Sequence, residues 1–283
     1  MRRAAPGLSL ALLAAERGAW LCTTIYYLVT GHLGWFGLTV ACVAPGYVAQ
    51  LLSILWFQAD GHPPSCWLLT LHLLQLGLCK RPAGGTPHPG DSRRYWGVSR
   101  LVAKTGGGAR GEEVPVQYGD ACVLRLLEAL LQTLPHLLLQ TYVVVAIDPA
   151  GFIPGVSAGL SLLSLAWALV SYSCFTCLLR PGHLFPPVTA ILCLLLWRIG
   201  MLGTRVLALV LFARLYSCWV LAVAGAHWLF MSFWLVAQQT DIVAQPCRWR
   251  LFNCLVGAVY VFCYVNVRPG PSKNRVAVFY AVS

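Results

Sequence analysis

The sequence contains few charged side chains, and acidic ones are the rarest. Only 10% of the 283 residues are charged, with 9 Asp and Glu against 20 Lys and Arg. Soluble globular domains usually contain about 25% charged residues. With 58% hydrophobic residues, the chain is also far too apolar to remain disordered. Composition therefore indicates a protein that lies in a lipid bilayer.

Several long segments lack charge entirely. There is no Asp, Glu, Lys or Arg in the 42 residues from Gly18 to Ala59, the 31 from Pro149 to Leu179 or the 26 from Leu215 to Thr240. A helix needs about 20 apolar residues to cross the hydrocarbon core of a bilayer. These runs do not alternate between apolar and polar residues, so we predict helices rather than the strands of a barrel.

Motifs of enzymes and metal sites are missing as well. The sequence has no P-loop, no nucleophile elbow, no HExxH and no cluster of His, Cys, Asp and Glu at ligand spacing. Most of the 12 cysteines lie inside apolar runs, where a free cysteine behaves as a small hydrophobic residue. We therefore expect no catalytic residue, no metal and no cofactor, and the protein is not predicted to be an enzyme.

The basic residues are concentrated in one connecting segment. Seven of them lie between Lys80 and Gln117, which is the longest polar stretch and is rich in Gly and Pro. An excess of Lys and Arg marks cytoplasmic loops of membrane proteins, so we predict that this loop is cytosolic. Basic residues in one loop beside membrane spans give no reason to expect a nucleic-acid partner.

We predict an all-α polytopic membrane protein that forms a single transmembrane domain over residues 1–283, with about seven spanning helices, a truncated eighth and one short half-membrane helix. A kink is expected in the second span at Pro45 and Gly46. Cys66–Leu78 is too short to cross and is predicted to be re-entrant or interfacial. The predicted spans are Leu8–Val29, Trp35–Phe57, Tyr118–Ile147, Pro154–Leu179, Pro187–Phe212, Tyr216–Gln239 and Leu251–Val267, followed by the truncated Val276–Ser283.

The third predicted span carries a polar stripe. Its members recur every three or four residues, which places them on one helix face about 120° wide: Arg125, Glu128, Gln132, His136 and Gln140. Polar and charged groups inside a membrane need partners or water. Two interpretations remain open, a helix-packing face joined by hydrogen bonds and a polar track for an ion or a lipid headgroup.

Other charges lie within predicted spans. Arg198 and Arg205 are seven residues apart and share a face of the fifth span, which contains no acid. We expect Arg205 to pair with Glu128 or with Glu16. Glu16 and Arg17 are adjacent and face about 100° apart, so they pair poorly with each other. One of them is expected to point inward or to extend toward the interface.

Three segments resemble the XK-related family of membrane proteins. They are His72–Gly77, Leu124–His136 and Arg205–Phe212, and their order and spacing match the family from about Leu8 onward. The resemblance implies an all-helical plasma-membrane protein with cytosolic termini, about eight spans and short half-membrane helices. Several members are phospholipid scramblases activated by caspase cleavage, whereas the founding member partners a membrane endopeptidase.

Scrambling members of that family carry intramembrane charges past which lipid headgroups move. Glu16, Asp120, Glu128 and Arg205 match such positions. Two acids expected from the resemblance are replaced here, by Trp20 and Gln132. From the resemblance we also expect that the last helices and the regulatory tail of the family are missing after Ser283.

Two functions follow from the resemblance. The first is a scramblase-like protein that handles phospholipids, with weak or absent scrambling by this chain. The alternative is a non-catalytic partner or escort of another, single-pass membrane protein.

Overall fold

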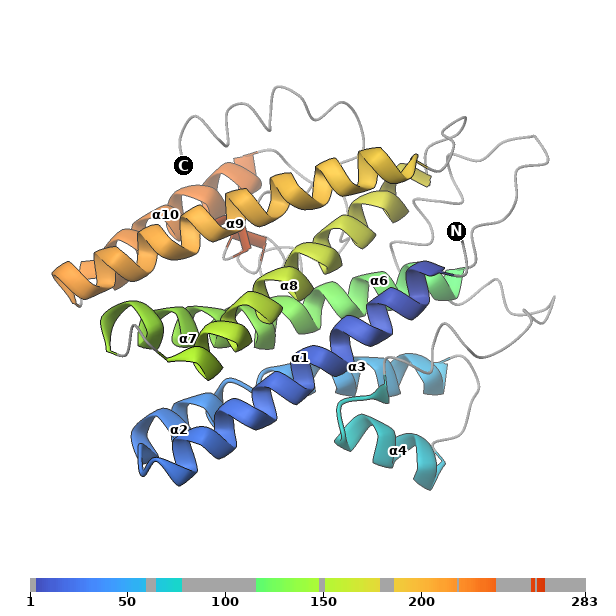
Figure 1. Cartoon of the computed structure of the whole chain (residues 1–283). Helices are drawn as coiled ribbons and strands as arrows, with labels where there is room; N and C mark the ends of the chain where they lie inside the picture. The colour runs from blue at the N-terminus through green and yellow to red at the C-terminus, as the bar shows by residue number, and fades with distance from the viewer. Residues whose placement is uncertain are drawn as a thin grey trace. The chain divides into compact units, whose positions relative to one another are not determined.

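The computed structural model describes residues 4–59, 65–77, 116–147, 151–178, 186–217, 219–237, 256–257 and 259–262. Every element with regular structure in these ranges is a helix, as predicted (Figure 1). Most of the Lys80–Gln117 loop, most of Leu251–Val267 and all of Val276–Ser283 lie outside the described residues. The predictions for these segments stay predictions.

Six stretches of the described chain are long and apolar enough to cross a membrane. Each corresponds to one of the first six predicted spans, which confirms the fold class. They cover Gly7–Val29, Leu33–Trp56, Ala121–Ala146, Phe152–Cys177, Val188–Tyr216 and Trp219–Ala237.

The second span is broken rather than merely kinked. Four residues separate the end of helix α2 (Leu33–Ala41) from the start of α3 (Gly46–Ala59). Pro45 has no N–H to donate to the carbonyl of Ala41, so the α-helical ladder cannot continue there. Short turns replace it, in which the Ala44 N–H donates to Ala41 at 3.2 Å and the Gly46 N–H to Val43 at 3.0 Å.

The third span is also irregular. It consists of α6 (Val116–Glu128), a π-helical turn η2 (Ala129–Thr133) and α7 (Leu134–Ala146). Pro135 cannot donate to the carbonyl of Leu131, and the N–H of Leu134 reaches back five residues to Ala129. The span therefore contains one wide turn in the middle of its polar stripe.

Helix α4 (Cys66–Leu73) is shorter than the predicted Cys66–Leu78. Its eight residues rise about 12 Å, too little to cross a bilayer. Ser65 caps its start by accepting a bond from the Leu68 N–H at 3.2 Å. At its end Gln75 adopts a left-handed conformation with φ 58°, and the Leu76 N–H closes the turn onto Leu71 at 2.8 Å.

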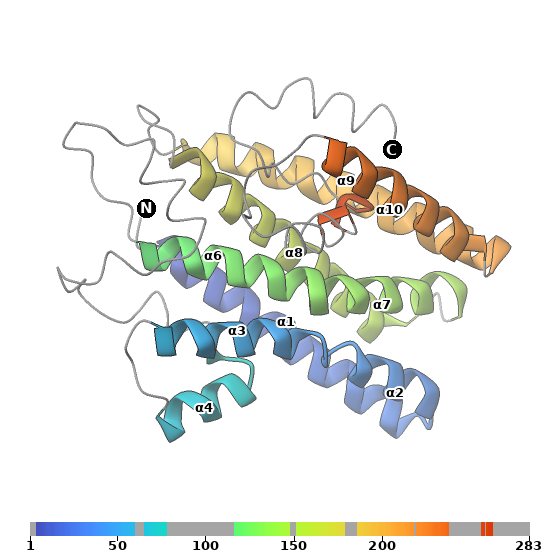
Figure 2. The same ribbon diagram turned by 180° about the vertical axis from the view of Figure 1, so that it is seen from behind.

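The chain divides into two compact units, residues 1–200 and 201–283. In the first unit, α1 (Ala4–Val29) packs against α8 (Phe152–Leu178) and α2, while α7 packs against α8 and α2. On the other side α3 contacts α6 and α4 (Figure 2). The α6–η2–α7 span therefore has neighbours on several sides, and its polar face lies inside the bundle.

The second unit contains the end of α9 (Val188–Tyr216) and α10 (Trp219–Ala237). His227 of α10 contacts the carbonyl of Tyr260 at 3.4 Å, and Arg205 of α9 donates to the carbonyl of Val261 at 3.3 Å. Tyr260 and Val261 thus connect to α10 and α9, respectively.

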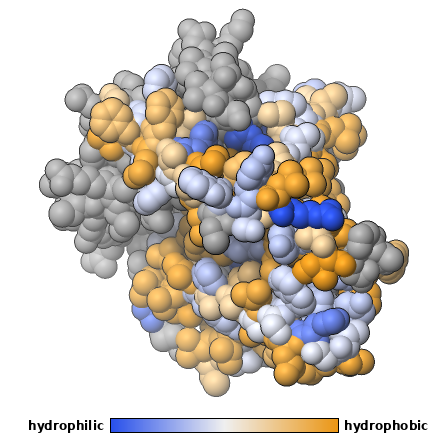
Figure 3. All heavy atoms as spheres, turned by 90° about the vertical axis from the view of Figure 1, so that its left-hand side faces the viewer, coloured by the Kyte–Doolittle hydropathy of each residue, from blue (hydrophilic) through white to orange (hydrophobic). Residues whose placement is uncertain are grey.

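Large apolar side chains cover much of the described surface. In Figure 3, hydrophobic residues are spread over the visible face, with hydrophilic ones in small groups between them. Helix α10 shows the pattern clearly, because Trp219, Leu221 and Phe233 are each at least 70% exposed. A surface of this kind suits contact with lipid chains.

A buried ionic cluster as the candidate functional site

The polar stripe of the third span faces the interior of the first unit. Glu128 and Gln140 are fully buried, and Gln132 and His136 are each 3% exposed. The Arg125 side chain is 16% exposed. The predicted stripe thus forms one continuous face, and this face is covered by other helices rather than open to the surroundings.

Four charged residues from two helices form an ionic cluster, which consists of Glu16, Arg17, Arg125 and Glu128. Arg125 is at its centre, with Nη1 2.6 Å from Glu128 Oε2 and Nη2 2.7 Å from Glu16 Oε2. Arg17 Nη2 reaches the other oxygen of Glu128 at 2.7 Å. Two positive and two negative groups make the cluster neutral, which is the arrangement that a buried set of charges requires.

Neutral side chains complete the hydrogen bonding of the two carboxylates. Thr133 Oγ1 and Ser164 Oγ donate to Glu16 at 2.6 and 2.5 Å. Gln50 Nε2 of α3 donates to Glu128 at 3.0 Å. None of these three residues was predicted from the sequence. A signal existed for Ser164, because Ser157, Ser161 and Ser164 recur at helical spacing and are all buried.

The π turn explains why Thr133 can reach Glu16. In a regular helix Thr133 would follow Glu128 by five steps of about 100° and point away from the stripe. A turn closed by bonds to the fifth preceding residue contains more residues, so each of them advances by a smaller angle. Thr133 is thereby rotated back onto the polar face, where it lies 2.6 Å from Glu16.

A second polar group lies farther along the same face. Tyr27 of α1 donates to Gln140 Oε1 at 2.7 Å, and Gln140 Nε2 donates to Thr39 of α2 at 3.3 Å. His136 Nδ1 is 3.2 Å from Ser161 Oγ of α8. These bonds join α7 to three neighbouring helices, which is the role expected of a packing face.

A pair of amides connects α4 to the π turn. Gln132 Nε2 donates to Gln75 Oε1 at 2.9 Å, and both side chains are buried. The left-handed backbone of Gln75, which a residue other than glycine rarely adopts, directs its side chain to this partner. Gly46, the first residue of α3, packs directly against the Gln132 amide.

We predict that Gly46→Ala destabilises the protein. A Cβ atom at this position would lie 1.9 Å from Gln132 Oε1, so the amide would have to move and its bond to Gln75 would break. Gly37→Ala is the matched control, because its Cβ would meet nothing within 4 Å. The apparent melting temperature in detergent should fall for the first variant and stay level or rise for the second. Equal values would contradict the close contact.

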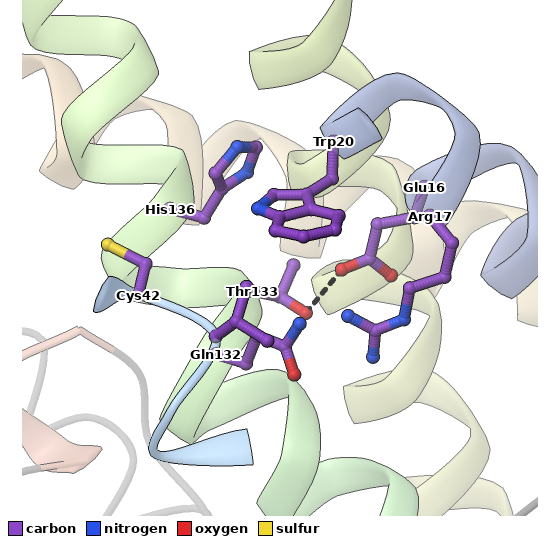
Figure 4. Close-up of a pocket in the computed structure, with 8 residues that line it drawn as sticks. Glu16, Arg17, Trp20, Cys42, Gln132, Thr133 and His136 are labelled. Carbon is purple, nitrogen blue, oxygen red and sulfur yellow. Dashed lines mark hydrogen bonds between the residues drawn. The ribbon is translucent and has the colours of Figure 1, made fainter. Parts of the chain in front are cut away.

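A small cavity borders the cluster. It has a volume of about 10 Å³ and is lined by Glu16, Arg17, Trp20, Cys42, Val43, Gln132, Thr133 and His136. Figure 4 shows Glu16, Arg17 and Trp20 extending from α1 toward Gln132, Thr133 and His136 on the third span. Trp20 occupies the position of an acid expected from the family resemblance, and its indole N–H donates to the carbonyl of Thr39 at 3.3 Å.

The remaining predicted residues lie elsewhere or are only partly described. Asp120 is in α6, but its side chain is outside the described residues. Arg198 is 9% exposed, and its guanidinium lies 5.1 Å from the ring centre of Trp197. Glu16 and Arg17 both point inward, which meets the expectation that at least one of them would.

The expected pairing of Arg205 with Glu128 or Glu16 would join residues of the two units, and it stays a prediction. Glu128 is held by Arg17 and Arg125, and Glu16 is held by Arg125. Within the second unit, Arg205 donates to the carbonyl of Val261 at 3.3 Å. Helix α1 brings its own cation, Arg17, into the cluster together with its acid.

The helices and the cluster define a multi-pass α-helical membrane protein with a neutral ionic centre inside its first unit. The XK-related protein family matches residues 5–283, which is nearly the whole chain. The protein belongs to the XK-related family, as the sequence resemblance predicts.

Proposed function

We propose that the ionic cluster of this chain is a structural lock, and that the protein in this conformation scrambles phospholipids weakly or not at all. The observation that supports this most directly is that the four charges satisfy one another in the bundle interior. Both Glu128 oxygens and both Glu16 oxygens accept bonds from protein donors. A headgroup would have to displace these partners before it could bind.

The available space leads to the same conclusion. A moving headgroup needs a continuous polar path, because a charged group left in hydrocarbon costs several kcal/mol. The cavity beside the cluster holds about 10 Å³, enough for roughly one water molecule. A phosphate group has four oxygen atoms and cannot enter without a rearrangement of the surrounding helices.

A liposome assay tests this proposal. The purified chain is reconstituted with a fluorescent phospholipid in both leaflets, and a membrane-impermeant reductant is added outside. We expect loss of the outer-leaflet signal only, as in protein-free vesicles, while a known scramblase serves as the positive control. Rapid loss of the signal from both leaflets would overturn the proposal, provided that the vesicles remain sealed to a soluble dye.

A second candidate function is phospholipid scrambling after the cluster opens. It is favoured by the two backbone irregularities beside the cavity, the α2–α3 break and the π turn, where a helix can change shape with little loss of hydrogen bonds. Trp20→Ala removes the largest side chain lining the cavity and should then raise the scrambling rate in the same assay. An unchanged rate in a correctly folded variant would count against this alternative.

If neither the unaltered chain nor the Trp20→Ala variant moves lipids, the proposed role is that of a partner or escort for a single-pass membrane protein. The exposed apolar faces of α9 and α10 offer a surface that a partner helix could cover. For localisation we propose the plasma membrane. Surface biotinylation of a tagged chain tests this, and retention in internal membranes would contradict it.

A further inference from the structure

His136 is a buried titratable side chain with a contact at each ring nitrogen. It is 3% exposed and belongs to α7, which packs against α8 and α2. Its Nδ1 is 3.2 Å from Ser161 Oγ of α8, and its Nε2 is 3.3 Å from Gln140 Nε2, one turn farther along α7. These contacts are not part of the ionic cluster, and together they determine where the ring carries its hydrogen.

The Gln140 amide decides which nitrogen of His136 is protonated. Its Oε1 accepts from the Tyr27 hydroxyl at 2.7 Å, a length typical of an O–H···O bond. Its NH2 group therefore faces Thr39 Oγ1 and His136 Nε2, both at 3.3 Å. An amide NH2 group only donates, so His136 Nε2 has to accept. The ring hydrogen is then on Nδ1, which donates it to the Ser161 hydroxyl.

The charged groups around His136 offer no partner for a second proton. Glu16 and Arg17 of α1 line the same cavity as His136, but Glu16 is already held by Arg125. Cys42, which caps the end of α2, lines this cavity as well. Helices α2 and α8 contain no charged residue. Since the ionic cluster is neutral, a proton on His136 would add an uncompensated positive charge inside the bundle.

We propose that His136 makes the contact of α7 with α1 and α2 sensitive to protons, because the closed arrangement requires a neutral ring with its hydrogen on Nδ1. A second hydrogen, on Nε2, would point at the Gln140 NH2 group, which cannot accept it. Either this bond is lost, or the amide turns over and presents NH2 to Tyr27, whose hydroxyl then loses its acceptor on α7. Protonation of one ring thus loosens α7 from α1, whether or not the chain moves lipids.

Nuclear magnetic resonance of the full chain in a lipid nanodisc tests the assigned tautomer. With nitrogen-15 in the histidine rings, protonated and unprotonated ring nitrogens give separate signals, and comparison with His136→Gln identifies those of His136. At about pH 7.5 we expect a protonated Nδ1 and an unprotonated Nε2. A hydrogen on Nε2 at this pH, alone or together with one on Nδ1, would overturn the proposal.

The pH dependence of thermal stability tests the consequence. A histidine in water takes up a proton at about pH 6.5. The unfolded chain therefore binds a proton at position 136 that the closed arrangement excludes, so stability falls as the pH falls below this value. Between about pH 7.5 and pH 5, this one ring should lower the apparent melting temperature in detergent by on the order of 5 °C.

Matched variants assign the effect to His136. His136→Phe keeps an aromatic ring without the titration, so its melting temperature should fall less over this pH range than that of the unaltered chain. His32→Gln is the control, because His32 is exposed and makes no side-chain bond at the start of α2. His72→Gln replaces another buried histidine. The decrease due to His136 should persist in both, and an equal decrease in His136→Phe and the unaltered chain would overturn the proposal.

Discussion

Replacing Arg125 by methionine is expected to destabilise the first unit by about 3–5 kcal/mol, the typical cost of breaking a buried ion pair. Arg125 bridges Glu16 and Glu128, so the substitution leaves Glu16 with only the hydroxyls of Thr133 and Ser164. An unpaired carboxylate inside a bundle lowers the free energy of unfolding far more than the removal of both partners of an ion pair does. The apparent melting temperature in detergent should fall on the order of 10 °C, or the variant should fail to accumulate.

A double-mutant cycle identifies the cause. Adding Glu16→Gln to Arg125→Met removes the orphan charge and leaves Arg17 paired with Glu128, so the double variant should be more stable than Arg125→Met alone. The control cycle combines Arg125→Met with Gln140→Met. Because Gln140 bonds to Tyr27 and Thr39, neither of which Arg125 contacts, these two losses should add. Additive losses in the first cycle, or coupling in the second, would contradict the cluster described above.

Deletion of Leu131 is expected to be tolerated far better than deletion of Leu139. The π turn Ala129–Thr133 behaves as one extra residue within an α-helix. Deletion of Leu131 should convert the π turn to a regular α-helix and leave Arg125 and Gln140 on the same face. Deletion of Leu139, in the regular helix α7, instead rotates everything after it by about 100°. Gln140 would then lose Tyr27 and Thr39.

Fluorescence-detected size-exclusion chromatography of the two deletion variants measures this difference. The first should elute as a single peak, because Thr133 then follows Glu128 by four steps of about 100° and stays on the polar face. The second should aggregate. Both leucines are partly exposed, so loss of the side chain itself is comparable in the two cases. Equal behaviour would show that the π turn does not act as a removable residue.

The sequence predicted the membrane class, the first six spans and the polar stripe, because these follow from local patterns of hydrophobic and polar residues. The stripe from Arg125 to Gln140 required only helical spacing. Its partners were harder to predict, since Arg17 and Glu128 are 111 residues apart. Helical periodicity shows which side chains share one face of a helix. It does not show which other helix packs against that face.

Local backbone irregularities were predicted unevenly. Pro45 beside Gly46 gave a clear signal for a kink, and the structure has a complete break there. Pro135 also prevents one helical hydrogen bond. A proline near the middle of a span can cause different backbone irregularities, so the sequence does not specify which one forms. The π turn allows Thr133 to bond to Glu16, which lies on another helix. A feature fixed by such a tertiary contact cannot be derived from its own segment.

The distance along the chain between the members of the ionic cluster has a consequence for biosynthesis. Glu16 and Arg17 precede Arg125 and Glu128 by 109 and 111 residues. At about 5–20 residues per second, the ribosome needs roughly 5–20 s to make that segment. During this interval α1 carries two charges without their partners, each of which costs about 3 kcal/mol at the centre of an inserted helix. Stable insertion of α1 therefore depends on the later arrival of α6, so the first span is stabilised only after the third has been made.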